Sequence, residues 1–330
     1  MAIRIAIVGP GRVGQAFARR WHEAGAEFLG FLGRDRERTQ AALEFVGHGR
    51  ALATADLADA HVLVLAVSDL ALRSVAVELA AASDLRSCGL ALHCSGSRGR
   101  DDLAPLAQRG LRTAALHPLA PFPDPTRGYA AMVGRHALCE AGPRAIRLTG
   151  RLATMAGLEP VFVDGPIDRT RYHLACALSA NGVTALLAQA GRQMARALAV
   201  EESLATRLCA DLLTSAVTLC VEVSPLQALS GPVVRGDVDL VARHLALLEG
   251  SAAADEPAAT TTTTPRALDS QTVDARTAAA YRALMLEALA LAEARGLSSE
   301  FASSLQSLLA TASGTVPHDG SGGTEGPSRG

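Results

Sequence analysis

Gly9-Pro10-Gly11-Arg12-Val13-Gly14 follows the apolar residues 3–8 directly and opens a stretch with helical apolar spacing. A glycine pattern of this kind is informative only between a strand and a helix, and here it has that context. Gly9 permits a tight turn, Gly11 lets the backbone approach a pyrophosphate, and Gly14 lets helix and strand pack closely. The helix N-terminus offers free N–H groups and a dipole that favours an anion. The first 70 residues are therefore predicted to form a dinucleotide-binding βαβ unit, with these six residues as cofactor contacts.

The choice of dinucleotide depends on the end of the second predicted strand, residues 27–32. NAD enzymes place an acid there to accept from the ribose 2′-OH. This chain has Arg34, whose guanidinium can bind a 2′-phosphate with two parallel hydrogen bonds. Asp35 comes one residue later, so a register shift of one would restore NAD. NADP is favoured, with Arg34 as the main contact and Arg36 and Arg38 either helping or forming a solvated basic turn.

Composition excludes several classes of protein. The chain has 330 residues, 49% of them hydrophobic and 19% charged, with a formal net charge of −2. This length favours two domains, and the balance fits neither a disordered chain nor a nucleic-acid-binding protein. Residues 3–8 are too few for a membrane span and lack the features of a signal peptide. We therefore expect a cytoplasmic protein with no membrane and no nucleic-acid partner.

All 31 basic residues are arginines, and the sequence contains no lysine. Schiff-base chemistry, a catalytic ammonium acid and a P-loop are thus excluded, because each needs a primary amine. The six cysteines stand singly without metal-ligand spacing. We expect them to pack as small hydrophobic residues, and we predict no metal site.

Apolar runs alternate with helical stretches through the first half of the chain, which predicts an α/β Rossmann domain with a doubly wound parallel sheet at 1–165. The predicted strands are 3–8, 27–32, 62–67, 89–93, 112–116 and 161–163, and the predicted sheet-covering helices are 11–24 and 70–82. Residues 166–312 are predicted to form an all-α domain, with helices expected at 169–199, 201–223, 238–248, 274–295 and 298–312. The biased segments at about 250–268 and at 313–330 are expected to be a flexible insert and a disordered tail.

The fourth strand ends in Ala66-Val67-Ser68-Asp69. Strand ends of this kind face the crevice where ligands bind in open α/β sheets. We therefore expect Ala66, Val67 and Ser68 to contact the cofactor, with Ser68 near the nicotinamide. Asp69 either joins them or caps the helix that is predicted to begin at residue 70.

A family resemblance rests on the N-terminal unit, the segments His93-Cys94-Ser95-Gly96-Ser97, His117-Pro118-Leu119 and Ser179-Ala180-Asn181, and residues 230–237. Together they resemble Rossmann-like proteins with a C-terminal DUF2520 domain, related to pyrroline-5-carboxylate reductase, F420-dependent NADP reductase and the β-hydroxyacid dehydrogenases. The resemblance extends nearly to residue 312. It implies an NADP-linked oxidoreductase with a helical dimerisation domain, hence a homodimer, but no particular substrate. β-Hydroxyacid dehydrogenases use a helix-borne lysine as acid/base, which this chain lacks.

Two histidines end predicted strands and are expected to point toward the crevice, where imidazole can move protons near neutral pH. His117 is the stronger candidate of the two, because it is followed by Pro118 and a proline-rich loop that would hold the site rigidly. His93 is the other, and for either one a neutral ring bonded to backbone is an equal alternative. Ser95, in the segment that starts at His93, is a further cofactor-contact candidate.

The first long helix carries Tyr172, His173 and Asn181. His173 and Asn181 are eight residues apart, so they lie roughly on one helical face. Tyr172 is an alternative proton donor to His117. Asn181 stands among apolar residues, and a buried amide there requires a hydrogen-bond partner, either the substrate or a structural group.

The segment Ser230 to Asp237 interrupts two predicted helices with Gly-Pro and Arg-Gly-Asp. Ser230 and Arg235 are predicted to bind a substrate carboxylate. The alternative is that an ion pair, Arg235 with Asp237 or Arg243 with Asp239, stabilises the loop.

Two functions are consistent with these residues. The first is an NADPH-dependent reductase that passes a hydride to a carbonyl or imine carbon of a small, anionic substrate, with His117 or Tyr172 supplying the proton. The second is a non-catalytic sensor of NADP(H) or a regulatory dimer, to which the absence of lysine adds weight.

Overall fold

The computed structural model describes residues 2–82, 84–250 and 270–310. The chain divides into two compact units, Met1–Thr184 and Ala185–Gly330, which are described separately. The predicted insert at about 250–268 lies outside the described residues, except for Gly250. The predicted tail at 313–330 lies entirely outside them.

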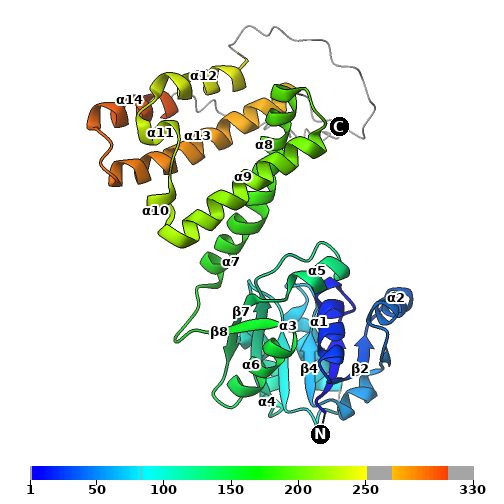
Figure 1. Cartoon of the computed structure of the whole chain (residues 1–330). Coiled ribbons are helices and arrows are strands. Elements are labelled where there is room, and N and C mark those ends of the chain that lie inside the picture. Colours follow the sequence, from blue (N-terminus) through cyan, green and yellow to red (C-terminus); the bar gives the residue numbers. More distant parts are fainter. Residues whose placement is uncertain (1, 83, 251–269, 311–330) are drawn as a thin grey trace, which may run out of the picture. The chain divides into compact units, whose positions relative to one another are not determined.

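An eight-stranded sheet in the order β3-β2-β1-β4-β5-β6-β7-β8 forms the centre of the first unit (Figure 1). Its strands are β1 (Arg4–Val8), β2 (Glu27–Leu32), β3 (Arg50–Ala51), β4 (Val62–Leu65), β5 (Leu90–His93), β6 (Arg112–Pro118), β7 (Arg135–Ala141) and β8 (Leu158–Phe162). Every neighbouring pair is parallel except β6 and β7, which are antiparallel. The predicted α/β fold class with a doubly wound sheet is confirmed. β3 and β7 were not predicted.

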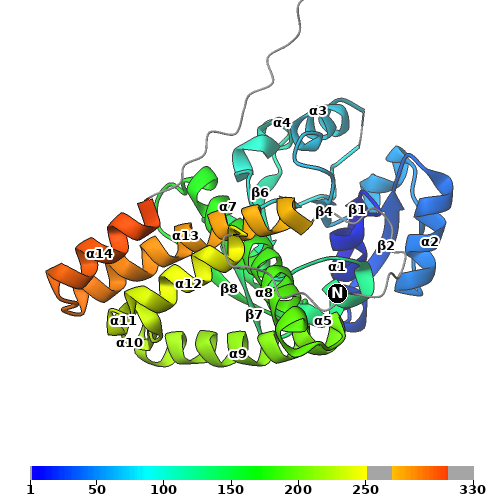
Figure 2. The ribbon, with the colours of Figure 1, turned by 90° about the horizontal axis from the view of Figure 1, so that it is seen from above.

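The helices of the first unit are α1 (Arg12–Glu23), α2 (Arg36–Val46), α3 (Leu72–Ala82), α4 (Ala104–Gln108), α5 (Pro125–Ala131), α6 (Ile146–Met155) and α7 (Arg169–Ala177), together with the short turns η1 (Thr54–Asp59), η2 (Arg100–Leu103) and the π-helical η3 (Leu178–Gly182). They cover both faces of the sheet because strand side chains alternate between faces. Ile5 and Ile7 pack with α1, α2 and α6, whereas Ala6 and Val8 pack with α3 and α4. Figure 2 shows α3 and α4 on one side of β1 and β4, and α1 and α5 on the other.

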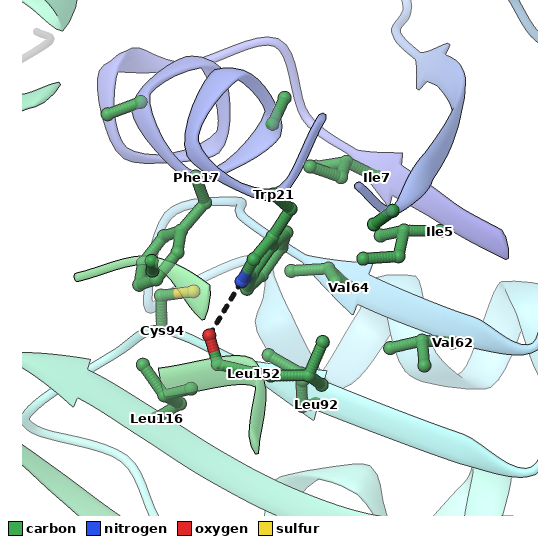
Figure 3. Packing of buried hydrophobic residues seen from close by; sticks show 14 of the residues in the cluster. Ile5, Ile7, Phe17, Trp21, Val62, Val64, Leu92, Cys94, Leu116 and Leu152 are labelled. Atoms are coloured by element: carbon green, nitrogen blue, oxygen red, sulfur yellow. Dashed lines mark hydrogen bonds between the residues drawn. The ribbon is translucent and has the colours of Figure 1, made fainter. Parts of the chain in front are cut away.

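Trp21, the only tryptophan, fixes α1 to the sheet. Its side chain is fully buried and stacks on Phe17 at 4.7 Å between ring centroids. The indole Nε1 donates a hydrogen bond of 2.8 Å to the carbonyl of Leu152 in α6, as Figure 3 shows. A large aromatic with a satisfied N–H is a strong anchor. It holds α1, and with it the glycine loop, against β1.

The second unit is all-helical, as predicted. It contains α8 (Val183–Leu198, whose first residues belong to the first unit), α9 (Glu202–Val223), α10 (Pro225–Ala228), α11 (Pro232–Arg235), α12 (Val238–Leu248), α13 (Ser270–Ala294) and α14 (Ser299–Ala310). α11 to α14 enclose a core that includes Val241, Leu289 and Leu305. Arg282 of α13 links the helices around this core. It donates a hydrogen bond of 2.8 Å to the carbonyl of Leu308 in α14 and forms an ion pair with Glu249, which follows α12.

Two helical segments leave much apolar surface uncovered. Residues Arg169–Leu198 and Glu202–Val223 are long and apolar enough to cross a membrane by length and composition. In α9, Leu212 is 70% exposed and Val221 is 83% exposed. Solvent-exposed apolar surface of this extent usually marks an interaction face.

Candidate functional site

The glycine loop has the geometry of a phosphate-binding turn. Gly9 has φ +98°, and a Cβ there would lie 2.5 Å from the carbonyl oxygen of Ala66; a Cβ on Gly14 would lie 2.7 Å from the carbonyl oxygen of Gly9. Packing within the protein therefore demands these two glycines. Gly11 differs, because a Cβ there would meet only the Ala66 oxygen, at 3.7 Å. The space over Gly11, beside a helix N-terminus without a side-chain cap, fits the pyrophosphate of a dinucleotide.

The side chain of Arg12 points away from the turn itself. Its Nη1 donates 3.0 Å to the carbonyl of Pro123, and Gln15 Nε2 donates 2.9 Å to the carbonyl of Pro10. The bond from Arg12 places the proline-rich loop beside the glycine loop. Val13 is half-buried behind the turn.

At the end of β2, Arg34 and Asp35 have different surroundings. Arg34 is exposed and its side chain has no bonded partner among the described residues. Asp35 is the N-cap of α2, where its Oδ1 accepts from the N–H of Arg38 at 3.0 Å. The N–H of Gly9 donates 3.0 Å to the carbonyl of Leu32, which joins the two loops. The carboxylate that would read a ribose hydroxyl is thus engaged locally, while the guanidinium is free.

Asp69, after β4, bonds to the loop that follows β5. The hydroxyl of Ser97 donates to its carboxylate. α3 begins only at Leu72, so the alternative that Asp69 caps this helix is wrong. Burial opposes ionisation of Asp69, but hydrogen bonds from Ser97 and Ser95 and the charges of Arg98 and His173 together lower its pKa.

The neighbouring residues complete this edge of the sheet. Ala66 lies against the glycine loop, as does the side chain of Val67, whose Cγ1 is 3.1 Å from the Cβ position of Gly9. Ser68 is exposed. The Ser95 hydroxyl accepts from the N–H of Arg98 at 3.2 Å.

His93 is a structural residue. It is fully buried, its Nδ1 accepts from the N–H of Ser95 at 3.2 Å, and its Nε2 bonds to the carbonyl of Gly99 at 3.1 Å. Because a carbonyl can only accept, the proton resides on Nε2 and the ring is neutral. Burial lowers its pKa. The backbone-bonded alternative therefore holds for His93, which has no nitrogen left for a substrate.

His117, at the end of β6, faces α7. Its Nδ1 lies 2.6 Å from the hydroxyl oxygen of Tyr172, and the rings meet edge to face. Burial lowers the pKa of His117 to about 4, with further lowering by His173 and Arg169. Burial also raises the pKa of Tyr172, and Cys176 adds to this. At neutral pH both groups are thus uncharged, so the Tyr172 hydroxyl can donate to Nδ1 and leave an N–H on Nε2.

The imidazole of His117 packs directly against Gly96, in space that a side chain at position 96 would fill. A Cβ on Gly96 would come within 2.7 Å of Cε1 and 2.8 Å of Nε2. Any larger residue would therefore push the ring away from Tyr172.

An ion pair fastens α7 to the sheet one helical turn before Tyr172. Arg169 pairs with Glu140 of β7, which also pairs with Arg100 at 3.4 Å. Glu140 lies opposite Ala115 in the β6–β7 register, two residues from His117 and on the same face. The Nη1 of Arg169 is buried without a hydrogen-bond partner in the described chain. Arg169, Arg100 and Glu140 were not among the predicted site residues.

Asn181 does not meet its expectation. It lies in the π-helical turn η3, is exposed, and its side chain has no hydrogen bond to the described residues. It is therefore not a buried amide that requires a partner. The π-turn itself is of interest, because such turns occur often at functional sites. His173 is also exposed, and its charge acts on both Asp69 and His117.

Ser230 and Arg235 belong to the second unit. Arg235 ends α11, is exposed, and makes no ion pair with described residues. Asp237 instead caps α12 by accepting from the N–H of Leu240 at 3.1 Å. Neither predicted loop ion pair forms in the described part of the chain, so the guanidinium of Arg235 remains available.

All six cysteines, which lie within the described residues, are free thiols. Cys88, Cys94, Cys139 and Cys209 are buried and Cys176 and Cys220 are half-buried. Burial raises the pKa of Cys88 to about 11, so its thiol is inert at neutral pH. Across residues 2–82, 84–250 and 270–310, no three His, Cys, Asp or Glu side chains are grouped to hold a metal ion.

Two family models match parts of the chain. Residues 1–118 match the family model of a Rossmann-like domain, and residues 136–288 match a domain of unknown function, DUF2520. No curated protein matches the chain.

Similar solved structures include a candidate NADP oxidoreductase from Bacteroides fragilis, with 15% identity, a TM-score of 0.63, and coverage of 87% of this chain and 98% of that one. A protein from Thermotoga maritima has 21% identity, a TM-score of 0.59, and coverage of 76% and 92%. A pyrroline-5-carboxylate reductase from Coxiella burnetii has 14% identity, a TM-score of 0.53, and coverage of 92% and 99%. At these identities the similarity establishes the fold.

Proposed function

Since the chain is a Rossmann-like protein with a C-terminal DUF2520 domain, we propose that it is an NADP(H)-dependent oxidoreductase acting on a small, anionic carbonyl or imine compound, or on its reduced form. The observation that carries this proposal is the placement of two features on one sheet edge. The glycine loop follows β1, and the His117–Tyr172 pair lies at the end of β6, with only β4 and β5 between them. Ligands of open α/β sheets bind along this edge.

The residues present fit a dinucleotide. The open space over Gly11 can admit the pyrophosphate. Arg34, which has no partner among the described residues, can bind a 2′-phosphate while Asp35 caps α2. This difference between Arg34 and Asp35 favours NADP over NAD. When bound, NADPH supplies a hydride from C4 of its nicotinamide.

His117 and Tyr172 provide the polar chemistry. A neutral imidazole that accepts from Tyr172 at Nδ1 presents its Nε2 N–H to a substrate oxygen or nitrogen, as a donor for the charge that develops there. The hydroxyl of Tyr172, which donates to Nδ1, can supply a proton to the imidazole when Nε2 gives up its own. No lysine is needed for this arrangement. Arg235 and Ser230 are proposed to bind the substrate's carboxylate.

Nucleotide titration tests the proposal directly. We expect the purified protein to bind NADPH more tightly than NADH, measured by calorimetry. Arg34→Asp should weaken NADPH binding by about tenfold or more, corresponding to about 1.4 kcal/mol, and leave NADH binding nearly unchanged. Arg147→Asp, an equal charge change on an exposed residue of α6, is the matched control. Equal losses for both nucleotides would show that Arg34 does not read the 2′-phosphate.

A substrate screen separates an enzyme from a sensor. Keto acids, cyclic imines and F420 are offered with NADPH, and absorbance of the reduced nicotinamide is followed. His117→Ala should abolish most turnover of any substrate found. Tight NADPH binding without turnover across all classes would instead favour the non-catalytic sensor.

The uncovered apolar faces support a homodimer as part of the same proposal. α9 carries Arg207 and Asp211 within its first half, and charges at such depth are costly in a bilayer. A protein partner therefore fits the exposed Leu212 and Val221 better than lipid does. Light scattering should give twice the mass of the chain, and Leu212→Glu should reduce it to that of a monomer.

A further inference from the structure

The carboxylate of Asp69 lies on the side of the dinucleotide site opposite Arg34. In the strand order, β2 is on one side of β1, while β4 and β5 are on the other. Arg34 follows β2, so the adenosine half belongs there and the other half of the molecule extends over β4 and β5. Asp69 follows β4 by four residues, three after Ala66, whose carbonyl lies against the glycine loop. Ser97 follows β5 by four residues.

Asp69 is held in place as an anion. The hydroxyl of Ser97 donates to it from a loop 28 residues later in the chain. That loop is itself fixed, since the N–H of Ser95 donates 3.2 Å to Nδ1 of His93 and the N–H of Arg98 donates 3.2 Å to the Ser95 hydroxyl. A carboxylate that accepts hydroxyl hydrogen bonds is stabilised in its charged form. The basic side chains that face it are Arg98, which also lies 4.0 Å from Asp102, and the exposed His173.

We propose that Asp69, positioned by Ser97, lies beside the nicotinamide and raises the affinity of the protein for the oxidised dinucleotide relative to the reduced one. The nicotinamide ring carries a positive charge when oxidised and none when reduced. A fixed, half-buried carboxylate attracts only the charged ring. This inference rests on the proposed dinucleotide function and adds a residue that sets the relative affinity of the two redox forms.

Binding constants for both redox forms test it without any turnover. NADP⁺ and NADPH are titrated by calorimetry into the full-length protein and into Asp69→Asn, whose amide oxygen can still accept from Ser97. We expect the substitution to weaken NADP⁺ binding by roughly tenfold and NADPH binding by less than about twofold. Asp102→Asn, which also removes one negative charge near this loop, is the matched control and should leave the ratio of the two constants unchanged.

The outcomes are distinct. If Asp69→Asn weakens both forms equally, Asp69 only joins the two loops and the inference is overturned. If the native protein binds neither nucleotide, the proposed function itself fails. If Asp69→Asn does not fold, as judged by thermal unfolding, Ser97→Ala replaces it. Without the Ser97 hydroxyl, the carboxylate of Asp69 is held less firmly, so the preference for NADP⁺ over NADPH should fall in part. An unchanged ratio of the two dissociation constants would count against the proposal.

Discussion

Nδ1 of His117 lies 2.6 Å from the hydroxyl oxygen of Tyr172, which comes 55 residues later in the chain. The two side chains come from different layers of the first unit, a strand end and a helix. Gly96 leaves room for the imidazole on one side, and the Arg169–Glu140 pair fixes the helix one turn away. This environment removes much of the imidazole from solvent and places positive charge nearby, which explains why the pKa of His117 falls to about 4.

The neutral state of His117 can be observed directly. In an NMR titration of the imidazole Cε1–H signals, His117 should remain neutral from pH 8 to about 5 and protonate near 4. Arg169→Gln removes a positive charge and should move this pKa upward. Arg171→Gln, on the same helix but paired with Asp168, should not. Titration of the native His117 near 6.5 would contradict the pair as described.

Stability should respond to acid through the same group. In the unfolded chain His117 has its ordinary pKa of about 6.5. In the folded protein its pKa is about 4, so it becomes protonated only at lower pH. As pH falls through this window the unfolded state binds more protons, so the free energy of unfolding decreases. Urea unfolding at pH 7.5 and 5 should show a smaller decrease for His117→Gln than for the native protein. An identical decrease in both would contradict the lowered pKa.

Gly96 should tolerate no side chain. Gly96→Ala puts a Cβ within 2.7 Å of the His117 ring, so the ring must move and its bond to Tyr172 should lengthen or break. We expect a stability loss of about 1–3 kcal/mol and a His117 pKa closer to its ordinary value. Gly142→Ala is the control, because its nearest neighbour would be Arg100 Nη1 at 3.6 Å. If the two variants behave alike, the close approach at Gly96 is not what positions the ring.

Substitutions at two glycines of the motif should have different effects, one on the stability of the protein and the other on nucleotide binding. Gly14→Ala meets the carbonyl oxygen of Gly9 at 2.7 Å and should destabilise the protein by about 1–3 kcal/mol. Gly11→Ala meets nothing closer than 3.7 Å and should keep its melting temperature. It should nevertheless weaken NADPH binding by about tenfold or more, or about 1.4 kcal/mol, because its methyl group occupies the pyrophosphate space. Retained affinity in Gly11→Ala would place the phosphates elsewhere.

Local sequence patterns were sufficient to predict most of the fold. β2 and α12 lie at their predicted residues, and the glycine loop lies between a strand and a helix, β1 and α1, as predicted. β7 was missed because its seven residues, RHALCEA, have polar ends and only three buried residues, which is a weak strand signal. Its antiparallel direction depends on pairing with β6, which no local pattern specifies.

Site residues that act alone were easier to predict than residues that act in pairs. His117 and Tyr172 were each singled out, but their hydrogen bond depends on where α7 lies against the sheet. Asp69 was equally consistent with a helix cap, and its partner Ser97 is 28 residues away. Glu140 and Arg169 carry no motif at all. Their role arises because β7 and α7 bring opposite charges together in a partly buried place.

The Arg169–Glu140 pair should be important for the stability of the first unit. Glu140 is the carboxylate partner of both Arg169 and Arg100, and one nitrogen of Arg169 already lacks a hydrogen bond. Removing one member of a partly buried ion pair leaves an uncompensated charge, so Glu140→Gln should destabilise the protein by about 1–3 kcal/mol. Trp21, the only tryptophan, lies in the first unit and reports its unfolding by fluorescence. Arg169→Met combined with Glu140→Gln should be more stable than Glu140→Gln alone, because the stranded charge is gone. Additive losses in this double-mutant cycle would show that the two residues act independently, and α7 would then be held by Tyr172 and its apolar neighbours.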